Sequence, residues 1–231
     1  MLAPDTTNEI PKLIAMDLDG TLVHSAPDVA RSIDTMLADF GLEPAGLERV
    51  QRYMGEGVER LIKRALTGDM QQEPPMPLYL QALNRFMSLY AEFNGRHSKV
   101  YPGVHQALTV FRNAGIPLCG ITNKKRCFAE PLLRRMQLDG FFEFWVCGDD
   151  LERKKPDPKP LLYAMHRLRV SAAAVWMVGD SVTDVMTARA AGVKVLAVSY
   201  GYNQGRDIRE AGPDIVVDSL LQICTILHLA V

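Results

Sequence analysis

Two acidic residues, one residue apart, follow a short apolar run near the start of the chain. The run 13–16 is apolar throughout, and Asp17-Leu18-Asp19-Gly20 comes directly after it. Such runs are typical of strands buried on both faces, and open α/β sheets bind ligands beyond the carboxyl ends of their strands. Gly20 would let the backbone turn close to a ligand. The segment is therefore a candidate site for carboxylate chemistry.

A calcium-binding loop and a solvated acidic turn are the alternatives for this segment. A calcium loop that begins Asp-x-Asp needs Gly at its sixth position and Glu at its twelfth, whereas Leu22 and Asp28 stand there. The solvated turn stays open when the segment is considered alone.

Groups that could bind a phosphate occur at two later places. Thr122 and Asn123 follow the apolar run 117–121, and the Thr122 hydroxyl could donate to a phosphate oxygen. Lys155 stands before Pro156, and its ammonium is a compact donor that could neutralise a phosphate. Taken alone, these residues also fit a helix cap and a solvated charged loop.

A further apolar run, 175–178, also leads to an acid. Asp180 follows it, and Asp184 lies where the next helix should begin. A carboxylate here suits a hard divalent cation, although a helix N-cap is the plain alternative. Several carboxylates around a phosphate dianion would repel it unless a divalent cation and a lysine offset the charge. The four segments together predict phosphoryl chemistry that depends on a metal.

Only a parallel sheet would bring these segments together. Helical patterns separate successive apolar runs, and this alternation predicts a doubly wound, Rossmann-like α/β sheet. The expected strands are 13–16, 117–121, 144–147, 175–178, 193–198 and 215–217, and the expected helices include 104–111, 131–138 (as the later part of a helix), 160–168 and 184–191.

The segment from about residue 27 to residue 95 breaks this rhythm. Apolar residues recur there at helical spacing over 29–40, 58–66 and 83–93, and no strand pattern is clear. We predict a small all-helical domain over 27–95, inserted after the first strand. Residues 1–26 and 96–231 would then form the α/β core.

The composition excludes several classes of protein. The 231 residues carry a formal net charge of -1, which argues against a nucleic-acid partner. An apolar run long enough to span a membrane is missing, and so is an N-terminal signal segment. The four cysteines form no CxxC pair, so we expect a cytoplasmic protein with reduced thiols.

The four segments, in this order, resemble the signature motifs of the haloacid dehalogenase superfamily. The resemblance extends from Leu13 to about Asp218, and the helical insert is similar to the small helical cap of that superfamily. His24 departs from the pattern, because Asp is usual there. Several shorter segments resemble the bacterial phosphoglycolate phosphatases within it: Ser25-Ala26-Pro27-Asp28, Met54-Gly55-Glu56-Gly57-Val58, Tyr101-Pro102-Gly103-Val104, Gly148-Asp149-Asp150 and Tyr200-Gly201-Tyr202.

The resemblance implies a Mg²⁺-dependent phosphatase that acts on a small phosphorylated metabolite, with 2-phosphoglycolate expected first. Asp17 would attack phosphorus, and Asp19 would serve as acid and base. Mg²⁺ would be held by Asp17, the Asp19 carbonyl and Asp180. The other expected site residues are Thr122 and Lys155 on the phosphoryl group, Leu18, Gly20 and Asn123 beside it, and Asp184 behind Lys155 or a metal-bound water.

The helical insert is expected to select the substrate. Gly55-Glu56-Gly57 would open a helix at Val58, and a helix N-terminus offers free N–H groups to a small anion such as a carboxylate. A simple turn at the two glycines is the alternative. We therefore include Gly55 and Glu56 among the candidate substrate-binding residues.

Several other functions remain as alternatives. The substrate could be a sugar phosphate or an amino-sugar phosphate, and a phosphomutase would share the same core chemistry. A dehalogenase would need neither Asp19 nor Asp180. A nucleotide-binding module without catalysis is disfavoured because no glycine-rich phosphate motif follows any strand. The full set of candidate catalytic residues also argues against an inactive metabolite sensor. We expect a monomer or a homodimer.

Overall fold

The computed structural model describes residues 10–230. It confirms the predicted fold class: six parallel strands form one sheet, in the order β5-β4-β1-β6-β7-β8. The strands are β1 (Leu13–Met16), β4 (Leu118–Ile121), β5 (Phe144–Val146), β6 (Val175–Gly179), β7 (Lys194–Val198) and β8 (Ile215–Val217). Each of them coincides with one of the apolar runs in the sequence.

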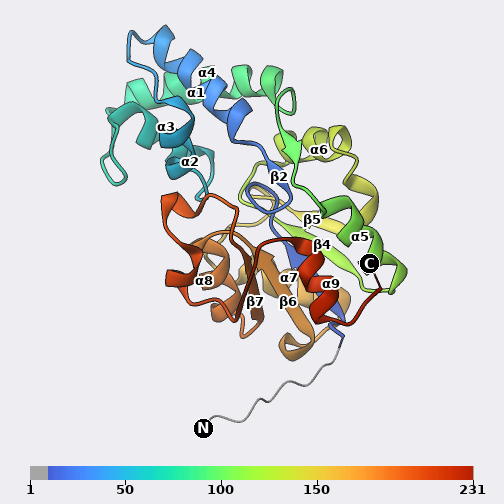
Figure 1. Ribbon diagram of the computed structural model, residues 1–231. Helices are drawn as coiled ribbons and strands as arrows, with labels where there is room; N and C mark the ends of the chain where they lie inside the picture. The colour runs from blue at the N-terminus through green and yellow to red at the C-terminus, as the bar shows by residue number, and fades with distance from the viewer. Residues whose placement is uncertain (1–9, 231) are drawn as a thin grey trace.

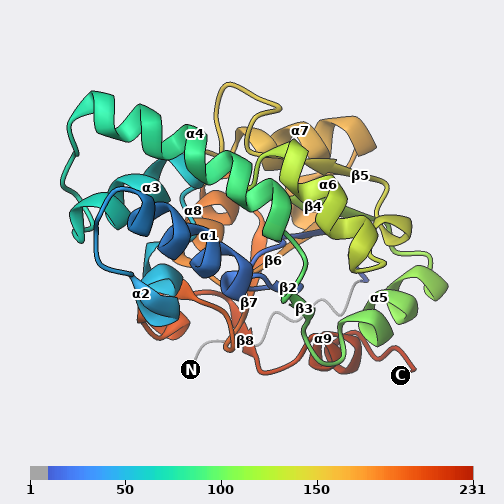
Figure 2. The ribbon, with the colours of Figure 1, turned by 90° about the horizontal axis from the view of Figure 1, so that it is seen from above.

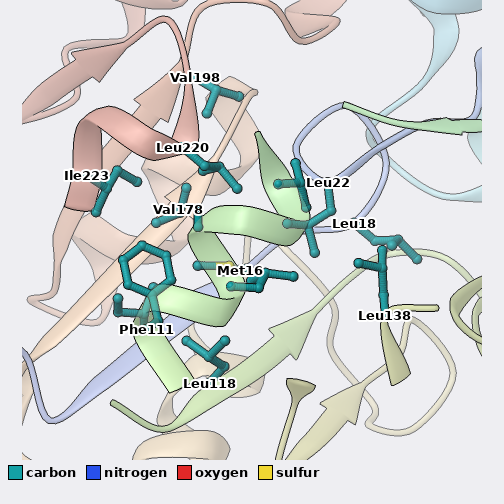
Figure 3. Packing of buried hydrophobic residues seen from close by; sticks show 14 of the residues in the cluster. Met16, Leu18, Leu22, Phe111, Leu118, Leu138, Val178, Val198, Leu220 and Ile223 are labelled. Carbon is teal, nitrogen blue, oxygen red and sulfur yellow. The ribbon is translucent and has the colours of Figure 1, made fainter. Parts of the chain in front are cut away.

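Helices cover both faces of the sheet because successive strand residues point to opposite sides. Ile14 and Met16 of β1 pack in one cluster with α5 (Val104–Asn113), α6 (Arg126–Arg135) and α9 (Leu220–Ile226), and Figure 3 shows part of this packing. Leu13 and Ala15 pack on the other face with α7 (Lys159–Leu168) and α8 (Val182–Ala190). The sheet is therefore doubly wound, as the alternating pattern predicted.

Four helices lie between the short strands β2 (Val23–His24) and β3 (Lys99–Val100) in the sequence and share a hydrophobic cluster, to which Phe128 of α6 also belongs. They are α1 (Ala26–Asp39), α2 (Gly46–Tyr53), α3 (Val58–Thr67) and α4 (Met76–Phe93). Figure 1 shows them together beyond one end of the sheet, and Figure 2 shows the same layer from above. The exact domain boundaries of 27–95 and 96–231 stay a prediction.

The chain passes between the sheet and these helices at two adjacent places. The short strands β2 (Val23–His24) and β3 (Lys99–Val100) pair in antiparallel fashion, with His24 opposite Lys99. The Asp28 carboxylate on α1 is fully buried and accepts hydrogen bonds from the backbone N–H groups of Gly95, His97 and Ser98. These contacts tie the outgoing and the returning segment to each other.

The structure also bears on membrane spans and on the cysteines. Within residues 10–230, no helix combines the length and the apolar character that a membrane span requires. All four cysteines lie within the described residues, and each is a free thiol. The short helices η1 (Asp139–Phe141), η2 (Ala172–Ala174), η3 (Asn203–Gly205) and η4 (Ile208–Ala211) complete the fold.

Candidate active site

The candidate residues meet at the carboxyl end of the sheet because their strands are neighbours. Asp17 follows β1, Thr122 follows β4 and Asp180 follows β6, and β1 lies between the other two strands. The backbone continues this pairing into the site, since Asp17 donates to the carbonyl of Val178 and Thr122 to that of Val146. Residues more than 150 positions apart in the sequence are thereby held at one point.

Lys155 lies between two of the acids. Its Nζ is 2.8 Å from Asp17 Oδ1 and 2.7 Å from Asp184 Oδ1. The Lys155 side chain is only 2% exposed, so water screens neither pair strongly. The lysine can therefore counter negative charge at Asp17 and at any anion that binds beside it.

Asp184 is saturated by its surroundings. Its second oxygen, Oδ2, accepts from Ser181 Oγ at 2.7 Å and from the backbone N–H groups of Ser181 and Asp180 at 3.1 and 3.2 Å. These bonds form a capping box at the start of α8. The Asp184 side chain therefore takes part in the helix cap and also contacts Lys155, the position that the resemblance implied for it.

Asp180 lies in a tight cradle. Thr21 Oγ1 donates to its Oδ1 at 2.9 Å, and the backbone N–H of Tyr202 donates to its Oδ2 at 2.8 Å. A Cβ at Gly20 would approach the Asp180 carboxylate to 2.3 Å, and a Cβ at Gly201 would approach its Cβ to 2.0 Å. Only glycine fits at either position.

The ionised forms of Asp17 and Asp180 are disfavoured in this site. Burial raises the pKa of Asp17 to about 7, and the nearby Asp184 carboxylate adds to the shift against the opposing effect of Lys155. Burial, with Asp184 and Asp17, also raises the pKa of Asp180 well above its usual range. The two carboxylates hold the pKa of Lys155 above its ordinary value although burial opposes this. The site holds more buried acids than one lysine can balance.

A divalent cation fits this imbalance. Oxygen atoms of Asp17, Asp180 and Asp184 all lie within 4.8 Å of one another. Carboxylate oxygens are the ligands that Mg²⁺ and Ca²⁺ prefer, and each oxygen has about two acceptor sites. Because Asp184 Oδ2 already accepts three hydrogen bonds, Asp17 and Asp180 are better suited than Asp184 to be metal ligands.

Lys124 is a site residue that the sequence interpretation left without a role. Its Nζ lies 2.9 and 3.0 Å from the two oxygens of Asp19 and donates to the Tyr90 hydroxyl of α4 at 2.6 Å. Ser25 also donates to Asp19. The lysine stands directly after Thr122-Asn123 in the sequence, but nothing in a local pattern indicates that its partners come from β1 and α4.

A cavity of ≈ 80 Å³ separates the sheet edge from the helical layer. Its polar wall is formed by the sheet edge, and its apolar wall includes Val58, Leu61 and Phe86 of the helices. The lining residues predicted from sequence are Asp17, Asp19, Gly55, Thr122, Asn123 and Asp180, and those not predicted include Lys124, Tyr90 and Tyr202. Leu18 and Gly20 are not among the lining residues: the fully buried Leu18 side chain packs in the core (Figure 3), and Gly20 lies against the Asp180 carboxylate.

The two candidate residues from the helical insert have different surroundings. The Gly55 carbonyl accepts a hydrogen bond from Asn123 Nδ2 at 2.9 Å, and Gly55 lines the cavity. Glu56 instead forms an ion pair with the buried Arg64 and accepts from Gln204 at 3.0 Å, and it is not among the residues that line the cavity. The structure thus places Glu56 as a link between α3 and the segment after β7.

The N-terminus of α3 already has an anionic partner. Half-burial opposes the shift, but hydrogen bonds from Lys125 and from its own backbone N–H lower the pKa of Glu59 to about 2. Glu59 also pairs with Lys154 Nζ at 3.2 Å. The Glu59 carboxylate thus accepts a hydrogen bond at the helix N-terminus where the sequence predicted a substrate anion.

Comparison with known proteins agrees with this geometry. A family model described as "Haloacid dehalogenase-like hydrolase" matches residues 14–198. The chain is 43% identical to a phosphoglycolate phosphatase of Nitrosococcus oceani, over 95% of this chain and 98% of that protein. It is 44% identical to one of Pseudomonas syringae pv. tomato, over 93% and 79%. The crystal structure of a predicted phosphoglycolate phosphatase from Haemophilus somnus superimposes with a TM-score of 0.89 at 32% identity, over 96% of this chain and 99% of that one.

Proposed function

The chain belongs to the haloacid dehalogenase-like hydrolase family and is a phosphatase, and from this premise we propose that it hydrolyses 2-phosphoglycolate to glycolate and phosphate. One observation carries the reaction: Asp17 directly follows a buried strand, 2.8 Å from Lys155, and lines a small cavity. A carboxylate in that place can attack phosphorus while the lysine neutralises the oxygens of the phosphoryl group.

Asp17 and Asp19 divide the chemistry between them. In-line attack by an Asp17 oxygen forms an aspartyl-phosphate as the bond from phosphorus to the ester oxygen breaks. Asp19 gives its proton to that leaving oxygen and then takes one from the water that hydrolyses the intermediate. The Thr122 hydroxyl and the Lys155 ammonium hold the phosphoryl oxygens, and Asn123, Leu18 and Gly20 shape the backbone around them.

Mg²⁺ is the cation we propose for the acidic cluster. The Asp17 and Asp180 carboxylates and the backbone carbonyl of Asp19 would hold it, and it would supply charge neutralisation at the phosphoryl oxygens. Asp184 keeps Lys155 directed at Asp17 through the 2.7 Å ion pair. The crowded glycines at positions 20 and 201 keep Asp180 in place for this task.

The size of the cavity supports a small substrate. A volume of ≈ 80 Å³ accommodates on the order of six waters, which suits a short acid better than a sugar ring. The names of the relatives point to the same substrate. A sugar phosphate or amino-sugar phosphate, or a phosphomutase reaction, would require the helical layer to move further from the sheet.

We propose that residues 27–95 form a cap that closes this cavity. The hydrophobic cluster formed mainly by α1–α4 supports the division, and closure would exclude bulk water during transfer. The substrate is a small phosphorylated metabolite. The four free thiols support a cytoplasmic location, and a monomer or a homodimer is the expected assembly.

Phosphate release from a panel of esters, with and without Mg²⁺, tests the proposal. The panel contains 2-phosphoglycolate, glucosamine 6-phosphate, glucose 1-phosphate and p-nitrophenyl phosphate. We expect the highest kcat/KM on 2-phosphoglycolate, in the presence of Mg²⁺ only. A higher kcat/KM on a sugar phosphate, or production of an isomeric sugar phosphate, would contradict the substrate assignment.

A further inference from the structure

Lys124 has a position that the phosphatase chemistry alone does not explain. Lys155 is the lysine proposed for the phosphoryl group and contacts Asp17 behind the cavity lining, whereas the Lys124 side chain, 6% exposed, lines the cavity itself. Its Nζ contacts Asp19, the acid proposed to protonate the leaving oxygen, and the Tyr90 hydroxyl of the helical layer. It therefore stands just beyond the ester bond, where the organic part of a substrate would be.

We propose that the Lys124 ammonium and the Tyr90 hydroxyl form the subsite for a substrate carboxylate, so that the enzyme selects phosphate esters of short 2-hydroxy acids. This inference rests on the proposed phosphatase function. In such an ester one carbon separates the leaving oxygen from the carboxylate. A leaving oxygen in contact with Asp19 thus brings the carboxylate within reach of Lys124.

The donors at this subsite suit an anion. An ammonium has three N–H donors, and without substrate they face the two oxygens of Asp19 and the Tyr90 hydroxyl, so a substrate carboxylate would take over one of the two donors directed at Asp19. Burial raises the pKa of Tyr90 to about 12, so its hydroxyl stays protonated, and its oxygen accepts from Lys124 while its own hydrogen can donate. The ring is fixed by Phe86 and Phe128, at centroid distances of 5.4 and 4.8 Å, so the hydroxyl is already in position.

Other cations near the cavity are less suited to this role. Lys125 lines the cavity but pairs with Glu59 at 2.8 Å, and Lys154 pairs with the same glutamate. Glu59 also receives its own backbone N–H, which leaves the α3 N-terminus a poor site for a second anion. Arg64 is directed to Glu56 and to the carbonyl of Tyr53. Among the described residues, Lys124 is the cation best placed for the carboxylate.

The test compares two esters that differ only in this group. 2-Phosphoglycolate carries a carboxylate, and its amide analogue, the phosphate ester of glycolamide, carries a neutral group of the same size. The selectivity is the ratio of kcat/KM for the acid to that for the amide. Removing a hydrogen bond to a charged group corresponds to roughly 10- to 150-fold, and removing a neutral one to roughly 2- to 12-fold. Both Lys124→Gln and Tyr90→Phe remove a hydrogen bond to the charged carboxylate, so each should lower the ratio by the larger factor.

Lys125→Gln is the matched control, because it removes a neighbouring positive charge from the same cavity wall. It should leave the ratio within a factor of two. Equal losses on both esters in Lys124→Gln would show that the lysine only supports Asp19, and a fall in the ratio in Lys125→Gln alone would move the subsite to Lys125. Either result would overturn the proposal.

Binding of glycolate gives a readout that does not depend on turnover. Titration calorimetry with glycolate should show weaker binding to Lys124→Gln than to the wild type, while inorganic phosphate binds both proteins equally. The wild-type ratio separates the two levels of inference. If the wild type does not prefer the acid over the amide, the proposed substrate is contradicted. If the wild type prefers the acid and Lys124→Gln keeps the same ratio, only the subsite is contradicted.

Discussion

At the scale of single residues, the site is built from charges that oppose one another at close range. Asp17, Asp180 and Asp184 share a buried space with one lysine, and burial first, then the repulsion between the acids, raises the pKa values of Asp17 and Asp180. Such an arrangement is costly in the resting protein and becomes favourable when a cation and a phosphate arrive together. The proposed chemistry and the proposed metal requirement therefore rest on the same feature.

Replacement of the nucleophile gives the first prediction. Asp17→Asn keeps the shape of the side chain and removes its charge, so the protein should fold and lose nearly all turnover. Asp19→Asn should lose roughly 10²- to 10⁴-fold in kcat, which is the usual contribution of one positioned acid–base group. Single-turnover phosphate release checks both variants, and near-wild-type kcat in Asp17→Asn would rule out the proposed nucleophile.

The second prediction concerns removal of the proposed metal. Chelation with EDTA should abolish phosphate release, and added Mg²⁺ should restore it. Ca²⁺ should inhibit, because its larger and looser coordination shell would place Asp17 poorly for attack. Thermal unfolding adds a readout apart from activity: the wild type should gain stability from Mg²⁺, and Asp180→Asn should gain less. Full activity in thoroughly chelated protein would contradict the metal requirement.

The sequence identified the acids of this site but not their neighbours. Asp17, Thr122 and Asp180 each follow an apolar strand, so a parallel sheet was enough to predict that they lie at one edge, and the observed order β4-β1-β6 makes them neighbours. Lys124 and Tyr90 come from elements with unrelated patterns, and their 2.6 Å contact depends on how α4 lies against the sheet. No local periodicity carries that information. The same holds for Glu56, whose partner Gln204 is 148 residues away.

At the scale of elements, length and apolar spacing decided what could be predicted. The six core strands are continuous apolar runs, and each was predicted. Helix α2 was missed because its eight residues bury only Val50 and Tyr53, which is too few for a clear stripe. Strands β2 and β3 have two residues each and exist only through their mutual pairing. Helix α6 spans Arg126–Arg135, so it ends before the predicted limit at 138, where Gln137 takes a left-handed φ of 56°.

The third prediction concerns the contact between α1 and the returning segment. Asp28→Asn replaces one acceptor oxygen by a donor that faces the N–H groups of Gly95, His97 and Ser98. Loss of hydrogen bonds to this buried charge should lower the free energy of unfolding by about 2–3 kcal/mol. Denaturant titration measures the change, with the exposed Asp139→Asn as the control. Equal stability of the two variants would show that Asp28 does not hold the crossing.

At the scale of the whole molecule, the helical layer is joined to the core by ion pairs as well as by the chain. Glu59 of α3 pairs with Lys125 at 2.8 Å and with Lys154 at 3.2 Å, both of which belong to the α/β part. Glu59 is 39% exposed, so these pairs are open to screening and each contributes only about 0–1 kcal/mol. They bias the helices toward the sheet without fixing them there.

Salt and pH should act differently on this contact, which is the fourth prediction. The pKa of Glu59 falls from 4.5 to about 2, so the stabilisation is present above pH 4.5 and is lost only as the pH falls toward 2. Between pH 6 and 9 the pairs should be constant, whereas 0.5 M NaCl should weaken them. We expect kcat/KM of the wild type to fall with salt and that of Glu59→Gln to fall less. An identical salt dependence in both proteins would contradict this role.

The antiparallel pairing of β2 and β3 has a consequence for how this protein can be rearranged. His24 and Lys99 face each other across the pair, and everything between them belongs to the helical layer and its connections. A two-residue turn such as Asn-Gly is the usual link between two strand residues in that relation. The chain could thus be closed into a simple hairpin at this point, or another cover could be grafted there, with the catalytic strands left in their register. The helical layer is therefore an insertion that could be exchanged as one unit, with His24 and Lys99 as its two junction residues.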